Sequence, residues 1–328
     1  VPKSLEAALL GGRSLEGEVI SKPGPTEFAS FDDLWRALLD QIAFGAELIA
    51  RVQTKNRALI PGECSFLLGS LFTDDCVERG QAILDGGARY YGSCIMAHGF
   101  TNAADALVAI KHEVFETGRE KLPDLVKALR DNFKGAEALR RRLLKAPKFG
   151  NDNDEVDGML VRLWQEITRL TDEAGKQAQL DFFTVSSVNP GGYFMGENCG
   201  ATADGRKACQ PFAIGNAPTA GADTHGLTAL LNSVSKVDPV NGGATTNVKL
   251  GRNLFSKNRP VIEALFSAFW KRGGMQATLT VVNQQDLEDA MKRPELYPHL
   301  LVRVGGWSAR FIDLDKKIQQ DIIRRSLY

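Results

Sequence analysis

The sequence "LLVRVGGWSARFIDLD" occupies residues 300–315, close to the C-terminal end of the chain. Its apolar run contains a single arginine, stops at Gly305 and Gly306, and resumes with Trp307. The run over residues 300–304 predicts a buried strand, and the two glycines indicate a tight turn after it. A turn accounts for the backbone shape, but it leaves open why two residues without a Cβ stand together here.

Glycine also permits a chemistry that other residues do not. Removal of a hydrogen atom from its Cα leaves a carbon radical between an amide nitrogen, which donates electron density, and a carbonyl, which withdraws it. Delocalisation requires this carbon to flatten, and a side chain would crowd the flat form. A glycine on a loop can therefore store an unpaired electron if the closed fold excludes oxygen and water. On the short motif alone, an ordinary turn is the simpler interpretation.

The chain before residue 180 carries helical patterns. In residues 31–52 apolar side chains recur at steps of three and four, which predicts an amphipathic helix with Ser30 as its N-cap. Pro123 and Pro147 mark interruptions of the helical pattern. Further helices are predicted over residues 66–84, 102–116, 122–144 and 154–179.

After residue 180 strands alternate with helices. Residues 180–188 predict a strand, and a glycine-rich passage follows over residues 189–226, where we expect Arg206 to bind backbone carbonyls. Asn247 and Lys249 belong to a further short strand; a plain strand is the simpler interpretation, and a position facing a barrel interior is the alternative. The closing helices are predicted over residues 285–293 and 315–328. This alternation indicates an α/β architecture.

One further strand, over residues 275–283, is predicted from its alternation. The apolar set, which we expect to face the core, is Met275, Ala277, Leu279 and Val281, and the polar set is Gln276, Thr278 and Thr280.

The composition excludes several classes of protein. Forty basic residues balance forty acidic ones, so net charge does not favour nucleic-acid binding. The basic run at residues 140–148 is expected to form the solvated face of a helix. No stretch approaches the roughly 18 consecutive apolar residues of a membrane span, and the first residues carry no secretory signal. The chain lacks an initiator methionine, which indicates processing or a fragment, and a cytoplasmic location is expected.

Cysteine and histidine patterns do not support a metal site. The five cysteines, odd in number, include no C-x-x-C pair, which argues against a disulfide framework and a zinc site. The four histidines form no pair spaced by four residues, so structural roles are expected. Neither a phosphate loop nor a dinucleotide-binding glycine motif follows a predicted strand. We therefore expect no metal and no bound cofactor. The residues concerned are Cys64, Cys76, Cys94, Cys199 and Cys209, and His98, His112, His225 and His299.

Several separate segments resemble one family, the glycyl radical enzymes of the pyruvate formate-lyase superfamily. "VRVGGWSARFIDLD" resembles the C-terminal fingerprint of that family, and "GATADGRKACQPFAIGNAPTAGADTHG" resembles its glycine-rich stretch. "DDCVERGQAILDGGARYYG" is similar to the branch containing glycerol and diol dehydratases, hydroxyproline dehydratase, arylacetate decarboxylases and sulfite-lyases. The matches span most of the chain in family order.

The resemblance implies a fold. We expect the second half of a ten-stranded α/β barrel, with extensive surrounding helices and a C-terminal glycyl radical domain. Residues 1–180 would form a mainly helical part of the pyruvate formate-lyase-like domain. Residues 181–328 would hold the barrel strands and the glycine radical domain.

The resemblance also implies the site residues. The radical glycine of the fingerprint falls on Gly306 and its preceding arginine on Arg303. Gly305, Trp307 and Ser308 are expected to support the radical loop. The usual tyrosine of the family is replaced by Trp307, a departure that retains an aromatic cover. We expect the barrel walls to shelter the Cα of Gly306.

In the family, the glycyl radical generates a thiyl radical on a cysteine of a separate loop, and the thiyl abstracts hydrogen from the substrate. Cys76, Val77 and Glu78 are similar to that loop, but the sequence around them aligns with a later helical region. We therefore expect Cys76 to be an ordinary, partly buried cysteine. The thiyl cysteine is expected on an upstream segment or a separate subunit.

The implied function is that of a lyase or dehydratase that cleaves a C–C, C–O, C–N or C–S bond of a small organic substrate. An activating enzyme that uses S-adenosylmethionine and an iron–sulfur cluster would install the radical on Gly306. An oxygen-sensitive oligomer of anaerobic metabolism is expected. Alternatives are formate C-acetyltransferase activity, a non-catalytic spare-part protein that donates a glycyl radical to a damaged enzyme, and a truncated inactive product.

Overall fold

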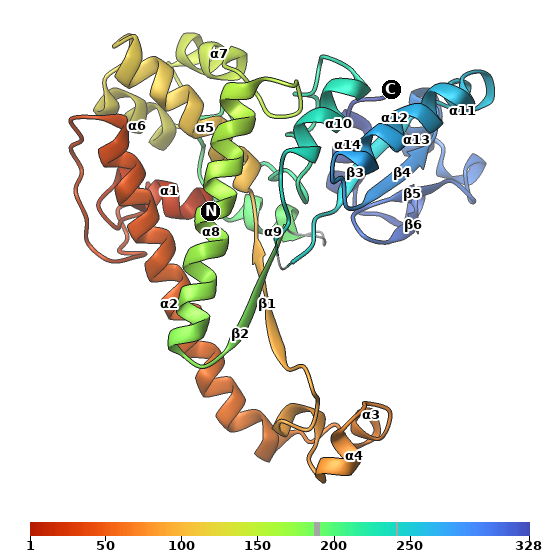
Figure 1. Cartoon of the computed structure of the whole chain (residues 1–328). Helices are drawn as coiled ribbons and strands as arrows, with labels where there is room; N and C mark the ends of the chain where they lie inside the picture. The colour runs from red at the N-terminus through yellow and green to blue at the C-terminus, as the bar shows by residue number, and fades with distance from the viewer. Residues whose placement is uncertain (187–190, 241) are drawn as a thin grey trace.

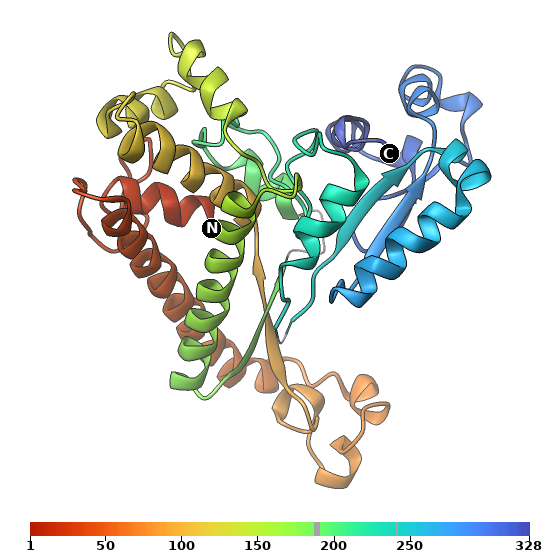
Figure 2. The ribbon, with the colours of Figure 1, turned by 45° about the horizontal axis from the view of Figure 1, so that its top comes forward.

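The computed structural model describes residues 1–186, 191–240 and 242–328. A helical body that extends into an arm and a second body that carries most of the later strands lie side by side in Figures 1 and 2. The helices of the first half are α1 (Pro2–Leu9), α2 (Phe31–Glu63), α3 (Leu67–Leu71), α4 (Cys76–Arg79), α5 (Phe100–Ile110), α6 (Leu122–Arg130), α7 (Glu137–Lys145) and α8 (Asp154–Gln177). Those of the second half are α9 (Gly191–Glu197), α10 (Leu227–Ser235), α11 (Arg252–Lys257), α12 (Arg259–Lys271), α13 (Gln284–Lys292) and α14 (Lys316–Arg324).

The strands form three two-stranded sheets within the described residues. β1 (Gly92–Ala97) pairs with β2 (Asp181–Ser186), and β3 (Thr246–Leu250) pairs with β4 (Ala277–Val281), both in parallel. β5 (Leu301–Arg303) pairs with β6 (Ser308–Arg310) in an antiparallel hairpin. Helices cross between the partners of each parallel pair, as parallel pairing requires. The α/β prediction is confirmed, and the described strands do not close a barrel.

Helix α2 begins where the sequence predicted. The Ser30 hydroxyl accepts a hydrogen bond from Asp33 N, and the Asp33 carboxylate accepts one from Ser30 N, which together make a capping box. Pro123 lies in the first turn of α6, where its missing N–H costs nothing, and Pro147 follows the end of α7. Both prolines interrupt the helical pattern as predicted.

The single helix predicted over residues 66–84 is wrong. The segment divides into the short helices α3 and α4 and a 3₁₀ turn over Ile83–Asp85. Phe66 and Asp75 adopt positive φ and Gly80 follows α4 in the same left-handed region, so the helical backbone is broken at three points. The predicted helix over residues 122–144 likewise divides into α6 and α7.

The buried face predicted for β4 is confirmed only in part. Ala277 and Leu279 pack against the larger core, but Met275 and Val281 are exposed, and Thr278 and Thr280 are buried. The threonines are satisfied by polar partners: Gln276 Nε2 donates to Thr278 Oγ1, and Arg303 N donates to Thr280 Oγ1 at 3.0 Å. Alternation identified the two faces but not their burial, because a buried hydroxyl is inexpensive once it is hydrogen-bonded.

The strand predicted over residues 300–304 is half-buried. Val302 and Val304 are buried, whereas the Leu301 side chain is 60% exposed. One face of a two-stranded hairpin packs against the core and the other lies in solvent, so successive side chains of the strand alternate between the two. The end of the strand predicted over 180–188, and the start of the glycine-rich passage at Asn189, lie outside the described residues.

Three hydrophobic cores organise the described part of the molecule, and the smallest packs α2, α8 and β2 together through Ala46, Ala174 and Phe182. The larger core joins α1, α2, α5, α8, α10 and α12, and its centre includes Phe100 and Trp164, whose rings lie 5.0 Å apart. A separate core unites the C-terminal unit, which we define as residues 282–325. Its buried members are Val282, Leu287, Ala290, Val302, Phe311 and Ile322.

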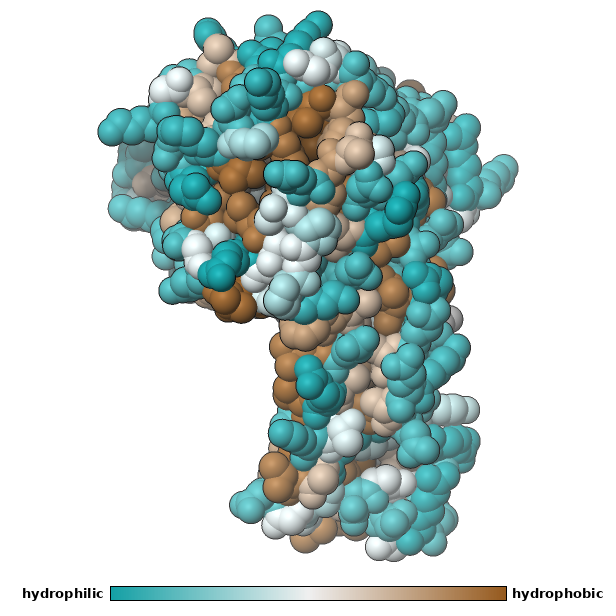
Figure 3. Space-filling view, turned by 90° about the vertical axis from the view of Figure 1, so that its left-hand side faces the viewer, coloured by the Kyte–Doolittle hydropathy of each residue, from teal (hydrophilic) through white to brown (hydrophobic). Residues whose placement is uncertain are grey.

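The arm exposes apolar side chains. It consists of the distal part of α2, with α3 and α4 at its end (Figure 1), and brown surface runs along it between teal side chains in Figure 3. Leu59, Leu68 and Phe72 are 65%, 71% and 84% exposed. Clusters of exposed apolar side chains of this kind mark surfaces that associate with other protein. No helix among the described residues has the length and apolar character that crossing a membrane requires.

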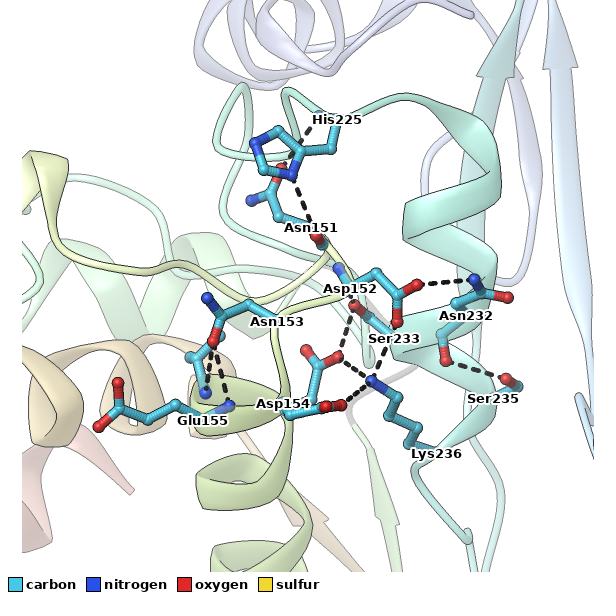
Figure 4. A network of polar contacts seen from close by, with 12 residues as sticks. Asn151, Asp152, Asn153, Asp154, Glu155, His225, Asn232, Ser233, Ser235 and Lys236 are labelled. Atoms are coloured by element: carbon cyan, nitrogen blue, oxygen red, sulfur yellow. Dashed lines mark hydrogen bonds and ion pairs between the residues drawn. The ribbon is translucent and has the colours of Figure 1, made fainter.

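A polar network fixes the junction between α8 and α10 (Figure 4). The Lys236 ammonium donates to Asp152, Asp154 and Asp157 at 3.0, 2.9 and 2.8 Å. Asn153 caps α8 by accepting from Glu155 N, and Asn151 accepts from His225 N. These contacts tie the end of the glycine-rich passage to the start of α8.

Asp105 is expected to make stability depend on pH. Its Oδ1 accepts from Phe149 N at 2.9 Å, but its buried Oδ2 has no hydrogen-bond partner in the described part of the chain. Burial raises the pKa of Asp105 to about 7, above the unfolded value of about 3.9. Its contribution to stability is therefore fully present below the unfolded pKa and is lost as the pH rises through about 7.

Asp105→Asn removes this titration. The free energy of unfolding of this variant should fall less between about pH 5 and pH 8 than that of the parent protein. Urea unfolding across this range measures the effect. Asp40→Asn, at a carboxylate that is 71% exposed, should keep the parental pH dependence. Equal pH dependence of the Asp105→Asn variant and the parent would contradict the assignment.

Candidate functional site

Gly305 and Gly306 lie at the tip of the β5–β6 hairpin. The strands pair Arg303 with Ser308, and Val304 N donates to Trp307 O at 3.0 Å to close the turn. The Arg303 guanidinium reaches along the turn, donating to Ser308 Oγ at 2.8 Å and to the carbonyl oxygen of Gly306 at 3.3 Å. The arginine, the serine and the second glycine of the sequence motif are thus brought together.

The expected shelter of Gly306 is not provided by the described residues. Gly305 is buried, but Gly306 is exposed and the Trp307 side chain is 44% exposed. The geometry of a hairpin explains the difference, because the residue at its outermost turn projects away from the body that holds the strands. A cover for Gly306 has to come from another surface.

Arg325 holds the hairpin from behind. Its Nη1 donates to the carbonyl of Arg303 at 3.3 Å, and its Nη2 donates to the carbonyl of Val304 at 3.2 Å. The same guanidinium donates to Asp321 Oδ2 and to Tyr193 Oη, both at 3.1 Å from Nη2. Tyr193 Oη in turn donates to Asp321 Oδ2 at 2.8 Å. One partly buried cation therefore connects α9, the end of α14 and the hairpin.

The electrostatics of this cluster keep the arginine charged. Burial disfavours the charge of Arg325, but the Asp321 carboxylate and Tyr193 outweigh it, so the pKa of Arg325 is raised. Burial and the Asp321 charge raise the pKa of the Tyr193 hydroxyl, which keeps it protonated as a donor.

Lys249 supports α14 from the adjoining strand. Its ammonium donates to the carbonyls of Ile322 and Ile323 at 3.1 and 3.0 Å, and to Gln284 Oε1 at 2.9 Å. A cation at a helix C-terminus satisfies the last carbonyls and favours the helix dipole. Burial and then the nearby Arg325 charge lower the pKa of Lys249 to about 8. Lys249 is thus buried against the end of α14, and a position facing a barrel interior stays a prediction, because the described strands close no barrel.

Two cavities lie between α14 and the glycine-rich passage, and Asp321 lines both. A small one of about 40 Å³ is lined by Asn247, Lys249 and Arg325, among others, and both polar side-chain atoms of Asn247 are buried with no partner in the described residues. A larger one, of about 600 Å³, lies between the end of α7 and the glycine-rich passage, and Arg140 and Arg324 help to line it. The described lining of neither cavity includes residues 303–308.

Arg206 orders the glycine-rich passage, as the sequence predicted. Its guanidinium donates to the backbone carbonyls of Gln210 at 2.6 Å and Gly196 at 3.4 Å, and also to that of Gly200. Its guanidinium carbon also lies 4.4 Å from the centre of the Phe212 ring. Burial lowers the pKa of Arg206. The buried guanidinium of Arg206 thus supplies hydrogen-bond donors to backbone carbonyls that have no partner strand in this passage.

One cluster with metal-ligand chemistry was not predicted. His112, Glu116 and Glu155 bring their ligand atoms within 4.8 Å of one another. The Lys111 ammonium lies 2.9 Å from Glu116 and 2.8 Å from Glu155, so it already supplies positive charge to both carboxylates. The sequence signal for this cluster is the four-residue spacing of His112 and Glu116, which places the two side chains about one helical turn apart.

The cysteines do not gather at the hairpin. All five are free. Cys76 is buried at the start of α4, in the arm, at the far end of the molecule from β5 and β6 in Figures 1 and 2.

Comparison with known proteins identifies the family of this fold. The pyruvate formate lyase-like family model matches residues 1–192, which is more than half of the chain, and the glycine radical model matches residues 212–312. The chain therefore belongs to the pyruvate formate lyase-like family. The division predicted at residue 180 stays a prediction.

The relatives are glycyl radical enzymes. Trans-4-hydroxy-L-proline dehydratase of Clostridioides difficile is 30% identical, over 99% of this chain and 42% of its own length. The B12-independent glycerol dehydratase of Clostridium butyricum superposes with a TM-score of 0.93 at 31% identity, over 100% of this chain and 42% of that one. A glycyl radical enzyme from Archaeoglobus fulgidus superposes with a TM-score of 0.93 at 32% identity, over 99% of this chain and 42% of that one. Further relatives carry the names of decarboxylases and sulfite-lyases.

The chain spans about 42% of the length of the curated relatives that match it at 30% identity or more. The fold prediction is confirmed to the extent that this α/β structure matches the folds of glycyl radical enzymes over its whole length.

Loss of the Arg206 contacts should destabilise the fold. Arg206→Met leaves several backbone carbonyls without a donor, so we expect the free energy of unfolding to fall by about 2–4 kcal/mol. Chemical unfolding followed by circular dichroism measures the loss. Arg140→Met is the matched control, because Arg140 makes one backbone contact, to Gly205 O at 2.9 Å. Equal losses in the two variants would contradict the role of Arg206.

Proposed function

We propose that this chain is the radical-carrying part of a glycyl radical lyase or dehydratase, with the unpaired electron on Gly306. The observation that carries the proposal is the position of Gly306 at a hairpin tip, with the Arg303 guanidinium on its carbonyl. Residues 303–308 also fall inside the segment matched by the glycine radical model.

The contacts suit a main-chain radical. Without a Cβ, the Cα of Gly306 can flatten and share the unpaired electron with the amide nitrogen and the carbonyl. Arg303 donates to that carbonyl at 3.3 Å, and a cationic donor strengthens its withdrawal of electron density. Ser308, which accepts from Arg303 at 2.8 Å, keeps the guanidinium beside the turn.

Two partners follow from this proposal. An activating enzyme that uses S-adenosylmethionine and an iron–sulfur cluster would remove the hydrogen atom from Gly306, and the exposure of Gly306 would give it access. A segment or subunit that carries the thiyl cysteine would then cover the tip. The exposed apolar side chains of the arm, Leu68 and Phe72 among them, offer an apolar surface to such a segment.

The substrate we propose is a small organic molecule, and the reaction is the cleavage of a C–O, C–C, C–N or C–S bond. The names of the relatives, which are dehydratases, decarboxylases and sulfite-lyases, favour this class over formate acetyltransferase activity. In this mechanism the chain binds no cofactor. It positions the glycine, and the segment or subunit that covers the tip shields it between turnovers.

Electron paramagnetic resonance tests the proposal. After anaerobic activation by the activating enzyme, the protein should show the doublet of a glycyl radical, because the remaining Cα hydrogen splits the signal. Gly306→Ala should abolish the doublet, and Gly305→Ala is the matched control in the adjacent position. The proposal fails if activated protein gives no doublet, or if the doublet survives in Gly306→Ala.

Exposure to air provides a second test. Oxygen that adds to a carbon radical on Gly306 should cleave the backbone there and release a short C-terminal peptide. Mass spectrometry of the activated protein before and after exposure measures the fragment. Gly306→Ala treated in the same way should stay intact, and cleavage at any other position would place the radical elsewhere.

A further inference from the structure

The larger cavity, of about 600 Å³, has a strongly cationic wall. It lies between the end of α7, the glycine-rich passage and α14, and its described lining contains no residue of the hairpin tip. Among the described lining residues, five side chains are cationic and two are carboxylates. They are Arg140, Lys145, Lys148, Arg206 and Arg324, and Asp204 and Asp321. The radical chemistry proposed for Gly306 does not explain this concentration of positive charge.

The two carboxylates do not neutralise the wall, because both already have donors elsewhere. Asp204 accepts from Asn102 Nδ2 at 2.8 Å. Asp321 accepts from Tyr193 Oη at 2.8 Å and pairs with Arg325, which is not among the described lining residues. Within the described part of the chain, neither carboxylate forms an ion pair with a cation of this wall.

Two of the five cations bind the chain itself. Arg206 donates to several carbonyls of the glycine-rich passage, that of Gln210 at 2.6 Å among them. The Lys148 ammonium donates to the carbonyl of Leu143 at 2.7 Å. These two side chains therefore have a structural role and contribute mainly their charge to the cavity.

The other three cations keep donors for a ligand. Arg140 donates to Gly205 O through its Nε at 2.9 Å, and its two terminal NH₂ groups have no hydrogen bond to a described residue. The side chains of Lys145 and Arg324 form no hydrogen bond or ion pair within the described ranges. Two helices that are far apart in sequence, α7 and α14, thus bring unused cationic donors to one cavity.

We propose that this cavity binds a small phosphorylated molecule through Arg140, Lys145 and Arg324. A phosphate group carries roughly 1.5–2 negative charges near pH 7, and guanidinium groups bind its oxygens through paired N–H donors. The volume is that of a small-molecule site, and Leu144 and Pro211 offer apolar surface to the organic part of such a ligand. The inference goes beyond the radical role of Gly306 and does not depend on it.

Isothermal titration calorimetry of the full chain with inorganic pyrophosphate tests the site. The parent protein should show one saturable site. Lys145→Gln and Arg324→Gln should each weaken binding by about 10-fold or more, because each removes a charged donor. The double variant should show no saturable binding. Both side chains are exposed and lack described hydrogen bonds, so the variants should fold as the parent does.

Matched controls separate the site from general electrostatic attraction. Arg141→Gln on α7 and Lys316→Gln on α14 each remove one positive charge from the same helices, at exposed positions outside the described lining. Both should bind pyrophosphate as tightly as the parent. Equal weakening in the controls and the cavity variants would overturn the site, and so would a parent protein without saturable binding.

Succinate distinguishes phosphate from carboxylate recognition. It should bind at least 10-fold more weakly than pyrophosphate, because it offers less charge and fewer acceptor oxygens, and equal affinity would refute the assignment to phosphate. Thermal unfolding gives a second readout: pyrophosphate should raise the Tm of the parent but not that of the double variant. A glycyl doublet in a parent protein that binds no pyrophosphate would refute this site and leave the role of Gly306 standing.

Discussion

The partly buried guanidinium of Arg325 is the contact that fixes the hairpin of the two glycines on the C-terminal unit. The strands β5 and β6 have three residues each, and a hairpin of that size is marginal without outside support. Arg325 supplies that support by binding the carbonyls that precede the turn, and Asp321 and Tyr193 keep its charge satisfied. The same contact fixes the backbone that leads to the buried Gly305 and the exposed Gly306.

A second arginine applies the same principle to the glycine-rich passage. Long segments without regular structure leave backbone carbonyls that need donors, and a guanidinium offers five N–H groups in a rigid fork. Arg206 meets this need around Gly196, Gly200 and Gln210. The chain thus uses single arginine side chains to bind backbone carbonyls in two irregular regions.

Local patterns and recognisable segments predicted a large part of this structure. The Ser30 cap, the α/β architecture and the carbonyl contacts of Arg206 follow from residue types whose hydrogen bonding is local or nearly obligatory. The burial of Thr280 and the exposure of Gly306 could not be predicted, because both depend on which elements lie opposite. The role of Arg325 was hidden for the same reason: its partners Tyr193 and Val304 are distant in sequence.

The exposed position of Gly306 makes the account specific, because a stable radical there needs a surface that covers the hairpin tip. The direct measurement is paramagnetic resonance of activated protein produced with glycine labelled with carbon-13 at Cα. The account predicts that the doublet of the unlabelled protein acquires the additional splitting of a carbon-13 nucleus that carries most of the spin. A signal that is unchanged by the label would place the unpaired electron on another residue type and would contradict the account.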